Sequence, residues 1–330
     1  MSVTVVALGL ATALAYGASD FLGGLASRRA EASLAVVAML KIVAVVAFLA
    51  GIPLAGAAPE AAAVAWGAIA GLAVGLGYLA YFRGLATGGM GIVATVTAIW
   101  AAIVPLVAGL LLGERPSPLA WAGIGAIVVA IVLITYTRAP AGDDESQPPA
   151  VPGADAEALV HYAGSGAPDH GSPQAIDAPP VDAPRAKLAV GLLEATAAGL
   201  AFGMFFVSLD RASAATGDGA LVWPLIVAAM AAAILVGTVA LAQRVDWRAA
   251  WAQAPGIVVA GVLYAAGTWA FIFAASQGWI SIVAVIVALS PAPTMLLARV
   301  LLSETLSARQ LFGASLALVG VALITAGLPE

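Results

Sequence analysis

Along the chain, apolar stretches of about 20 residues alternate with short polar connections. A helix of that length spans the hydrocarbon core of a bilayer, because each helical residue advances 1.5 Å. The pattern therefore predicts an all-α polytopic membrane protein with ten transmembrane helices. The ten predicted spans are Val3–Ala26, Ser33–Leu54, Ala61–Ala86, Gly91–Leu112, Leu119–Tyr136, Leu188–Leu209, Ala220–Ala242, Ile257–Ser276, Ile280–Leu302 and Gln310–Gly327.

Part of the first half of the chain recurs in the second half. With a shift of 190 positions and no gap, Tyr81–Ile134 lies over Phe271–Ile324, and 16 of the 54 pairs are identical. Most of these pairs are small or aliphatic residues, which match by chance in so apolar a chain. In both copies an apolar run ends at a glutamate, and a serine three residues later precedes the next run. This predicts a tight helix–turn–helix at the water boundary, with the serine capping the second helix. The informative pairs are Gly88/Gly278, Glu114/Glu304, Ser117/Ser307 and Gly123/Gly313.

The stretch Thr137–Ala186 differs from the rest of the chain in composition. It holds nine of the 19 prolines, eight of the 18 acidic residues and both histidines, His161 and His170. Such a segment cannot bury enough apolar surface to fold, so we interpret it as a disordered linker that binds no metal. The predicted domains are a first five-helix repeat over residues 1–136, the linker over 137–187 and a second repeat over 188–330. An odd number of spans in each half makes the repeats inverted in topology.

Two five-helix halves, each with a Gly-Glu or Ser-Glu pair after its fourth span and a Gly-rich last helix, resemble the EamA-type branch of the drug/metabolite transporter superfamily. The pairs are Gly113-Glu114 and Ser303-Glu304. The earlier spans match more weakly, through Tyr16-Gly17 and Phe202-Gly203. The resemblance covers nearly the whole chain except the linker. It implies a secondary transporter, often an exporter of amino acids or related metabolites.

Composition excludes several other classes of protein. Charged residues make up 9% of the chain, whereas soluble domains approach about a quarter. Without cysteine, and without histidine inside a predicted span, the usual intramembrane nucleophiles and metal ligands are missing, so we expect no enzyme. No Walker A loop is present, so transport is not ATP-driven. We expect no cofactor and no nucleic-acid partner, since much of the acidic excess lies in the linker.

Loop charges and the family resemblance disagree on orientation. Arg115 and Arg211 lie on the N-terminal side of the predicted membrane, and eight Lys and Arg residues lie on the other side. The positive-inside rule then places the linker in the cytoplasm and both termini outside. Ten-helix relatives are usually drawn with cytoplasmic termini.

Three ionisable residues inside predicted spans are candidates for binding substrate or protons. Asp20 and Lys41 lie about 10 and 12 Å inside consecutive helices, entered from the same connection, so we expect an ion pair between them. Glu194 lies in the same half of the membrane and has no cation nearby in the sequence. The alternative is structural: an Asp20–Lys41 pair that stabilises the fold, and Glu194 at a helix entrance.

Further candidates come from the prolines and aromatic residues. Ser290-Pro291-Ala292-Pro293 interrupts the ninth span, and the prolines are expected to free the carbonyls of Val287 and Leu289. Broken mid-membrane helices are where transporters place their sites, although prolines also kink helices that have no site. We include Ser290 and Tyr16, together with Trp100 and Trp269, which wall a substrate cavity or fill the core. The run Gly71-x-x-x-Gly75-x-Gly77 predicts close helix packing.

The function expected from all of this is alternating-access transport of a small metabolite such as an amino acid, in the plasma membrane. Protons are the simplest coupling ion, with Glu194 as their carrier, while Asp20 and Lys41 hold the charged ends of a zwitterionic substrate. The expected partners are the substrate, protons and the lipid bilayer, and the sequence selects no oligomeric state. The alternatives are a drug or sugar-type permease, a passive channel, and a non-transporting scaffold or sensor.

Overall fold

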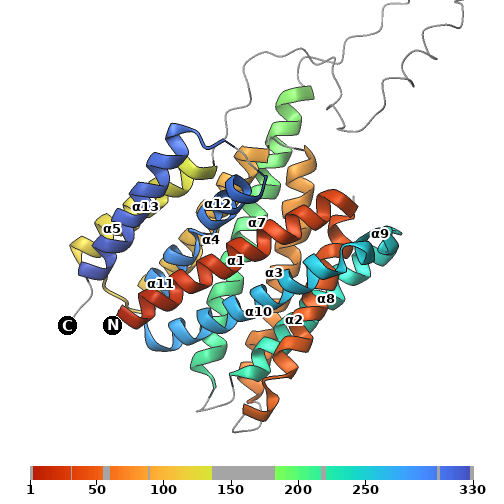
Figure 1. The fold of residues 1–330 in the computed structure, drawn as a ribbon. Helices are drawn as coiled ribbons and strands as arrows, with labels where there is room; N and C mark the ends of the chain where they lie inside the picture. Colours follow the sequence, from red (N-terminus) through yellow and green to blue (C-terminus); the bar gives the residue numbers. More distant parts are fainter. Residues whose placement is uncertain are drawn as a thin grey trace, which may run out of the picture. The chain divides into compact units, whose positions relative to one another are not determined.

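The computed structural model describes residues 3–30, 32–54, 60–87, 90–135, 183–216, 221–302 and 305–327. These residues form helices and their connections, without a strand among them (Figure 1). The contacts reported below belong to one compact unit, formed by Met1–Thr137 and Lys187–Glu330. The helices are α1 (Val3–Ala30), α2 (Ser33–Leu49), the 3-10 turn η1 (Ile52–Leu54), α3 (Ala61–Thr87), α4 (Met90–Leu111), α5 (Pro118–Thr135), α7 (Ala183–Ala214), α8 (Val222–Ala242), α9 (Trp247–Ala252), α10 (Ala254–Gln277), α11 (Ile280–Val287), α12 (Pro291–Leu302) and α13 (Ala308–Ala326).

The prediction of ten spans is confirmed. In the described ranges, nine segments are long and apolar enough to cross a membrane, and α11 with α12 counts as one of them. The tenth span, α2, is equally apolar but has 17 residues, because its helix ends at Leu49 rather than at Leu54. The chain then turns through Gly51 and η1, where Pro53 and Gly51 both disfavour a continuing helix.

Two helix boundaries differ from the expectation. Helix α7 runs from Ala183 to Ala214, longer at both ends than the predicted span. Residues 183–187 of the predicted linker are thus helical, and the rest of it, with His161 and His170, lies outside the described residues. The short helix α9 was not predicted. Asp246 caps it by accepting hydrogen bonds from the backbone N–H groups of Arg248 (2.8 Å) and Ala249 (3.4 Å).

The last helices of the two halves, α5 and α13, pack against each other and run antiparallel (Figure 1). Gly123, near the start of α5, lies against Ile324, near the end of α13. Gly313, near the start of α13, lies against Ile134, near the end of α5. The shift of 190 positions exchanges these two contacts. A helix and its counterpart that run antiparallel in this way confirm that the two halves are inverted.

The first helices of the halves repeat as well, although their sequences match weakly. Gly17 of α1 lies against Thr294 of α12, and Gly203 of α7 lies against Val104 of α4. Val104 and Thr294 correspond under the same shift, and Gly17 and Gly203 are the pair noted in the sequence. The absence of a side chain lets each of these helices approach the broken or proline-containing span of the other half.

Both serines of the repeated helix–turn–helix cap the following helix, as predicted. Ser307 forms a capping box with Gln310: its hydroxyl accepts a hydrogen bond from the Gln310 N–H, and the Gln310 side chain accepts one from the Ser307 N–H. The Ser117 hydroxyl accepts a hydrogen bond from the N–H of Ala120 at 3.2 Å. It also donates one at 2.7 Å to the carbonyl of Gly327, where α13 ends, so this cap joins the two halves.

The glycine run in α3 serves close packing, as predicted. Gly71 and Gly75 face α8, where a Cβ on Gly71 would run into the backbone of Ala228. Gly77 faces α7 instead, and a Cβ there would meet the ring of Phe202. The run therefore positions α3 between α7 and α8.

The ninth span is broken, but its carbonyls are not left free as expected. The carbonyl of Val287 accepts a hydrogen bond from the N–H of Ser290 at 3.0 Å, and that of Leu289 accepts one from Ala292 at 2.9 Å. The break is thus a tight turn between α11 and α12 that satisfies its own backbone. This correction has a simple cause, since i to i+3 hydrogen bonds replace the helical ones on either side of a proline.

Candidate functional site

Lys41 of α2 is fully buried, and aromatic rings surround its ammonium group. Its Nζ lies 3.2 Å from the centre of the Tyr264 ring of α10 and 4.9 Å from that of Tyr78 of α3. The Nζ atom makes no hydrogen bond. A cation over an aromatic face is attracted by the quadrupole of the ring, so the rings replace part of the hydration that the ammonium loses.

The expected ion pair between Asp20 and Lys41 is wrong for this conformation. The two charges are close enough to interact electrostatically, but no oxygen of Asp20 lies within hydrogen-bonding reach of the Lys41 ammonium. The physical reason is that Lys41 turns toward Tyr264 and Tyr78, whereas Asp20 remains in solvent-accessible space.

Asp20 is exposed on an inward face of α1. At 100° per residue, it shares this face with Ala13 and Tyr16, both buried, and lies about 120° around the helix from the exposed Leu14. Gly24, one turn further along the same face, is exposed as well. Asp20 is thus exposed, whereas Lys41 is fully buried against aromatic rings.

Tyr16 is the buried aromatic residue one turn before Asp20. Its ring stacks on that of Tyr264, with 5.5 Å between ring centres, and lies 6.3 Å from that of Phe206 of α7. Its hydroxyl is 3.0 Å from that of Thr268, which itself donates a hydrogen bond to the Tyr264 carbonyl. Because a hydroxyl carries one proton, Tyr16 is the donor to Thr268. This bond fixes the Tyr16 ring, which stacks on the Tyr264 ring that Lys41 contacts.

A second group of rings, half-buried, continues from Tyr78 along α3 to α7. Tyr78 meets Phe202 edge-on with 5.2 Å between ring centres, and Tyr81 and Phe82 complete the group. Such edge-to-face and tilted pairs stabilise one another. Tyr78 is the member of this group that contacts Lys41, as Tyr264 is in the group formed with Tyr16 and Phe206.

The break in the ninth span lies beside Tyr16. Gly17 packs directly on Ser290 and Pro293, and the Thr294 hydroxyl donates hydrogen bonds to the carbonyls of Gly17 (2.8 Å) and Ser290 (3.1 Å). Ser290 itself is half-buried. Its contact with Gly17 places it next to the candidate site.

The remaining candidates lie elsewhere in the bundle. Trp100 packs through its Cβ on Gly199 of α7. Trp269 packs on Phe48 and Gly51, about two helical turns of α2 beyond Lys41. These two tryptophans fill helix contacts and do not meet the rings around Lys41.

Glu194 is half-buried at a distance from Lys41. Its Cβ lies near Gly84 of α3, and the next residue, Ala195, accepts a hydrogen bond from the Thr97 hydroxyl of α4 at 3.1 Å. It is two turns of α7 before Phe202, or about 12 Å along the helix axis. The structure thus brings together Tyr16, Asp20, Lys41 and Ser290. It places Glu194 apart from them, beside Gly84 of α3.

Sequence reasoning missed residues at the site. The rings of Tyr78 and Tyr264 contact the Lys41 ammonium. In the sequence, the one sign of this is that both tyrosines lie about as deep in their spans as Lys41 does. Asp210 was also missed, because the predicted span ended at Leu209. It is buried and forms an ion pair with Arg211 at 2.6 Å.

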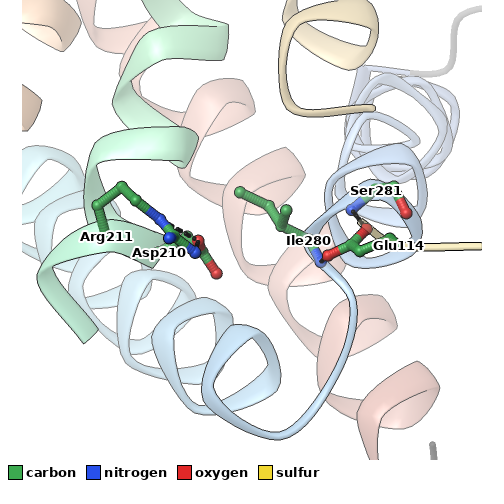
Figure 2. Close-up of polar contacts among 5 residues, drawn as sticks. All are labelled: Glu114, Asp210, Arg211, Ile280 and Ser281. Carbon is green, nitrogen blue, oxygen red and sulfur yellow. Dashed lines mark hydrogen bonds and ion pairs between the residues drawn. The ribbon is translucent and has the colours of Figure 1, made fainter. Parts of the chain in front are cut away.

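Glu114 follows the end of α4, as the sequence predicts, and it also contacts the other half of the chain. Its two carboxylate oxygens accept hydrogen bonds from the N–H groups of Ile280 (2.8 Å) and Ser281 (3.0 Å), at the start of α11 (Figure 2). The same view shows the pair Asp210–Arg211 at the end of α7. Glu114 thus joins the first half to the second, whereas the Asp210–Arg211 pair lies within α7 of the second half.

The arrangement can bind charged groups of both signs. Among the described residues no cluster of three or more His, Cys, Asp or Glu side chains is placed to hold a metal ion. A reachable carboxylate, a buried ammonium and a wall of rings suit a small molecule with charged ends and an apolar body.

Comparison with known proteins agrees with the fold. A solved structure titled "Crystal structure of protein" aligns with 99% of this chain and 98% of its own, at a TM-score of 0.65 and 15% identity, and this likeness concerns the fold alone. Among curated proteins, none matches the chain. The model of the EamA-like transporter family matches residues 3–136 and again residues 189–326, once for each half.

Members of that family are transporters rather than enzymes, and its two-repeat architecture is the one observed here. The chain thus belongs to the EamA-like transporter family, as a multi-pass membrane protein of the drug/metabolite transporter superfamily that transports a small molecule.

Proposed function

We propose that this protein is a secondary exporter of small zwitterionic metabolites such as amino acids, in the plasma membrane, working by alternating access. The observation that carries the proposal is an exposed carboxylate, Asp20, near a buried ammonium, Lys41, that makes no hydrogen bond. Asp20 binds the amino group of the substrate and Lys41 its carboxylate. The rings of Tyr16, Tyr78 and Tyr264 bind the apolar part.

The unpaired state of Lys41 supports this assignment. A buried ammonium is costly, so in a purely structural role it would be expected to pair with the nearest carboxylate. Lys41 instead rests against rings, which bind a cation more weakly than a carboxylate does. A substrate carboxylate offers the ammonium a stronger partner than it has in the empty site, and this difference favours binding.

For energy coupling we propose Glu194 as the proton carrier. It is a half-buried carboxylate inside α7, on a different part of the bundle from Asp20 and Lys41. Because the proton and the substrate bind to separate groups, protonation of Glu194 can change the conformation of the substrate site at Asp20 and Lys41.

The test is exchange in proteoliposomes loaded with amino acids, sugars or organic cations, with and without an imposed pH gradient. We expect exchange of amino acids, accelerated by the gradient. Glu194→Gln should keep exchange but lose the acceleration, while Glu60→Gln, which removes an exposed carboxylate before α3, serves as the matched control. Exchange of sugars or cations without amino acids would instead favour a sugar or drug permease, and unaltered acceleration in Glu194→Gln would remove this residue from coupling.

A further inference from the structure

The bundle is sealed at one end of the site and accessible at the other. All eight residues of α11 are buried, whereas in α12, the second part of the same span, Met295 alone is buried. The inward face of α1 shows the same change: Ala13 and Tyr16 are buried, and Asp20 and Gly24 are exposed. The site is thus closed toward the start of α11, and its more exposed end is the one that carries Asp20 and Gly24.

Glu114 lies at the sealed end and joins the two halves there. Helix α4 ends in a Schellman motif, in which the N–H of Glu114 donates to the Gly109 carbonyl and that of Gly113 to the Leu110 carbonyl. Gly113 takes a positive φ of 94°, which glycine adopts without strain. This turn directs the Glu114 side chain across to the start of α11, where it accepts both hydrogen bonds.

The surroundings leave room for the carboxylate. A Cβ at Gly109 would collide with the Glu114 carboxylate, so α4 has no side chain where that group passes. The N–H groups of Ile280 and Ser281 have no intrahelical partner, because they lie at the start of α11. The Glu114 carboxylate accepts a hydrogen bond from each, and a negative charge is favourable at a helix N-terminus. On the other side of α11, Gly9 of α1 lies against Ile286, which completes the seal.

We propose that Glu114 is the latch of the gate on this side of the site. Its carboxylate holds α11 of the second half onto α4 of the first half, and opening toward this side requires both hydrogen bonds to break. The turn at Ala288–Ser290 lets α11 move without α12. This inference rests on the alternating-access part of the proposed function and not on the identity of the substrate. Glu114 acts through α11 and is a positioning residue.

The test measures accessibility by thiol labelling, and the chain contains no native cysteine. Ser281→Cys reports on the sealed end, since this side chain is fully buried and its hydroxyl makes no hydrogen bond that the thiol would lose. Gly24→Cys reports on the open end, where a new Cβ meets nothing within 4 Å. Ala232→Cys, fully buried in α8, reports on general loosening of the bundle.

With Glu114 intact, we expect fast labelling at position 24 and slow labelling at positions 281 and 232. Glu114→Ala should raise the labelling rate at position 281 by about tenfold or more, since one hydrogen bond to a charged group is worth about that factor. The rate at position 24 should fall, and the rate at position 232 should not change. Glu114→Gln, which keeps one acceptor, should lie between, and Glu60→Gln should behave as the parent.

Three results would overturn the latch. These are an unchanged rate at position 281 in Glu114→Ala, a rise at positions 281 and 232 together, and failure of both Glu114 variants to fold. The last two would make Glu114 a structural cap. Because labelling needs no substrate, the latch is established even if no exported amino acid is found. Conversely, transport with unchanged labelling rejects the latch and keeps the proposed function.

Discussion

At the scale of single residues, the cost of burying a charge distinguishes function from packing. Removing an ion from water costs several kcal/mol, and a desolvated cation–π contact returns about 2 kcal/mol or more. Lys41 is fully buried, makes no hydrogen bond and rests on two tyrosine rings. By this comparison its ammonium lowers the stability of the empty protein, which is expected of a binding group rather than of a structural one.

Replacing Lys41 with methionine should therefore leave the protein as stable as the parent or more stable, because an unbranched apolar chain fits the same space without the desolvation cost. Exchange of substrates that carry a carboxylate should be lost, and Lys41→Arg, which keeps the charge, should retain part of it. Thermal melting in detergent and exchange in proteoliposomes measure the two effects. A methionine variant that melts well below the parent and still exchanges substrate would make Lys41 structural.

The same measurement examines the missing ion pair. Because Asp20 and Lys41 interact electrostatically but share no hydrogen bond, the stability changes of Asp20→Asn and Lys41→Met should depart from additivity by only about 0.5 kcal/mol, the low end for interacting residues. A double variant that recovers the stability lost by a single one would indicate that the two residues pair in another conformation.

At the scale of elements, glycines decide which helices touch. Gly17 and Gly24 lie one above the other on the inward face of α1, two turns apart. Gly17 is buried against the turn between α11 and α12, where a Cβ would run into the Ser290 carbonyl. Gly24 meets nothing within 4 Å. The same residue type thus makes a helix contact at one position and leaves open space at the other.

Gly17→Ala should cost about 1–3 kcal/mol, because a rigid backbone carbonyl must give way. Gly24→Ala is the matched control, and it should be neutral or stabilising by up to about 1 kcal/mol, since alanine favours the helix. Melting temperatures of the two variants in the same detergent provide the comparison. Equal melting temperatures would show that α1 does not pack on the broken span as described.

At the scale of the whole molecule, the bundle is built from two inverted halves whose contacts exchange under the repeat. Gly123 with Ile324 and Gly313 with Ile134 form one such pair of contacts. Hydrogen bonds from Ser117 to the Gly327 carbonyl and from the start of α11 to Glu114 also join the halves. The halves are thus held by their own interface, within the unit that the described residues form.

Shortening the predicted linker between residues 137 and 182 to a flexible Gly/Ser tether should consequently preserve folding and exchange. Its acidic, proline-rich composition favours a connector over a packed element, and a shorter flexible loop costs little entropy. The yield of monodisperse protein and the exchange rate in proteoliposomes test this. Normal expression without exchange would show that the segment takes part in transport.

Much of the architecture follows from the sequence alone, because its determinants are local. Bilayer-length apolar runs located all ten spans, the repeat predicted the inverted halves, and Ser117 and Ser307 cap the helices that they precede. The glycine run in α3 predicted close packing. The deviations are also local: α7 continues past the predicted end at Leu209, and Asp210 within it pairs with Arg211.

The contents of the candidate site were decided by the tertiary structure. Their depth within the predicted spans indicated Asp20 and Lys41 as candidates, but it predicted an ion pair between them. Lys41 instead contacts Tyr78 and Tyr264, which belong to helices distant in the chain. The sequence placed Glu114 at a helix end but gave no partner for it, and it bonds to residues 166 and 167 positions away. Hydropathy sums over neighbours along the chain and so determines where the helices run. Which side chains meet depends on the rotation and approach of packed helices, and only the assembled bundle sets these.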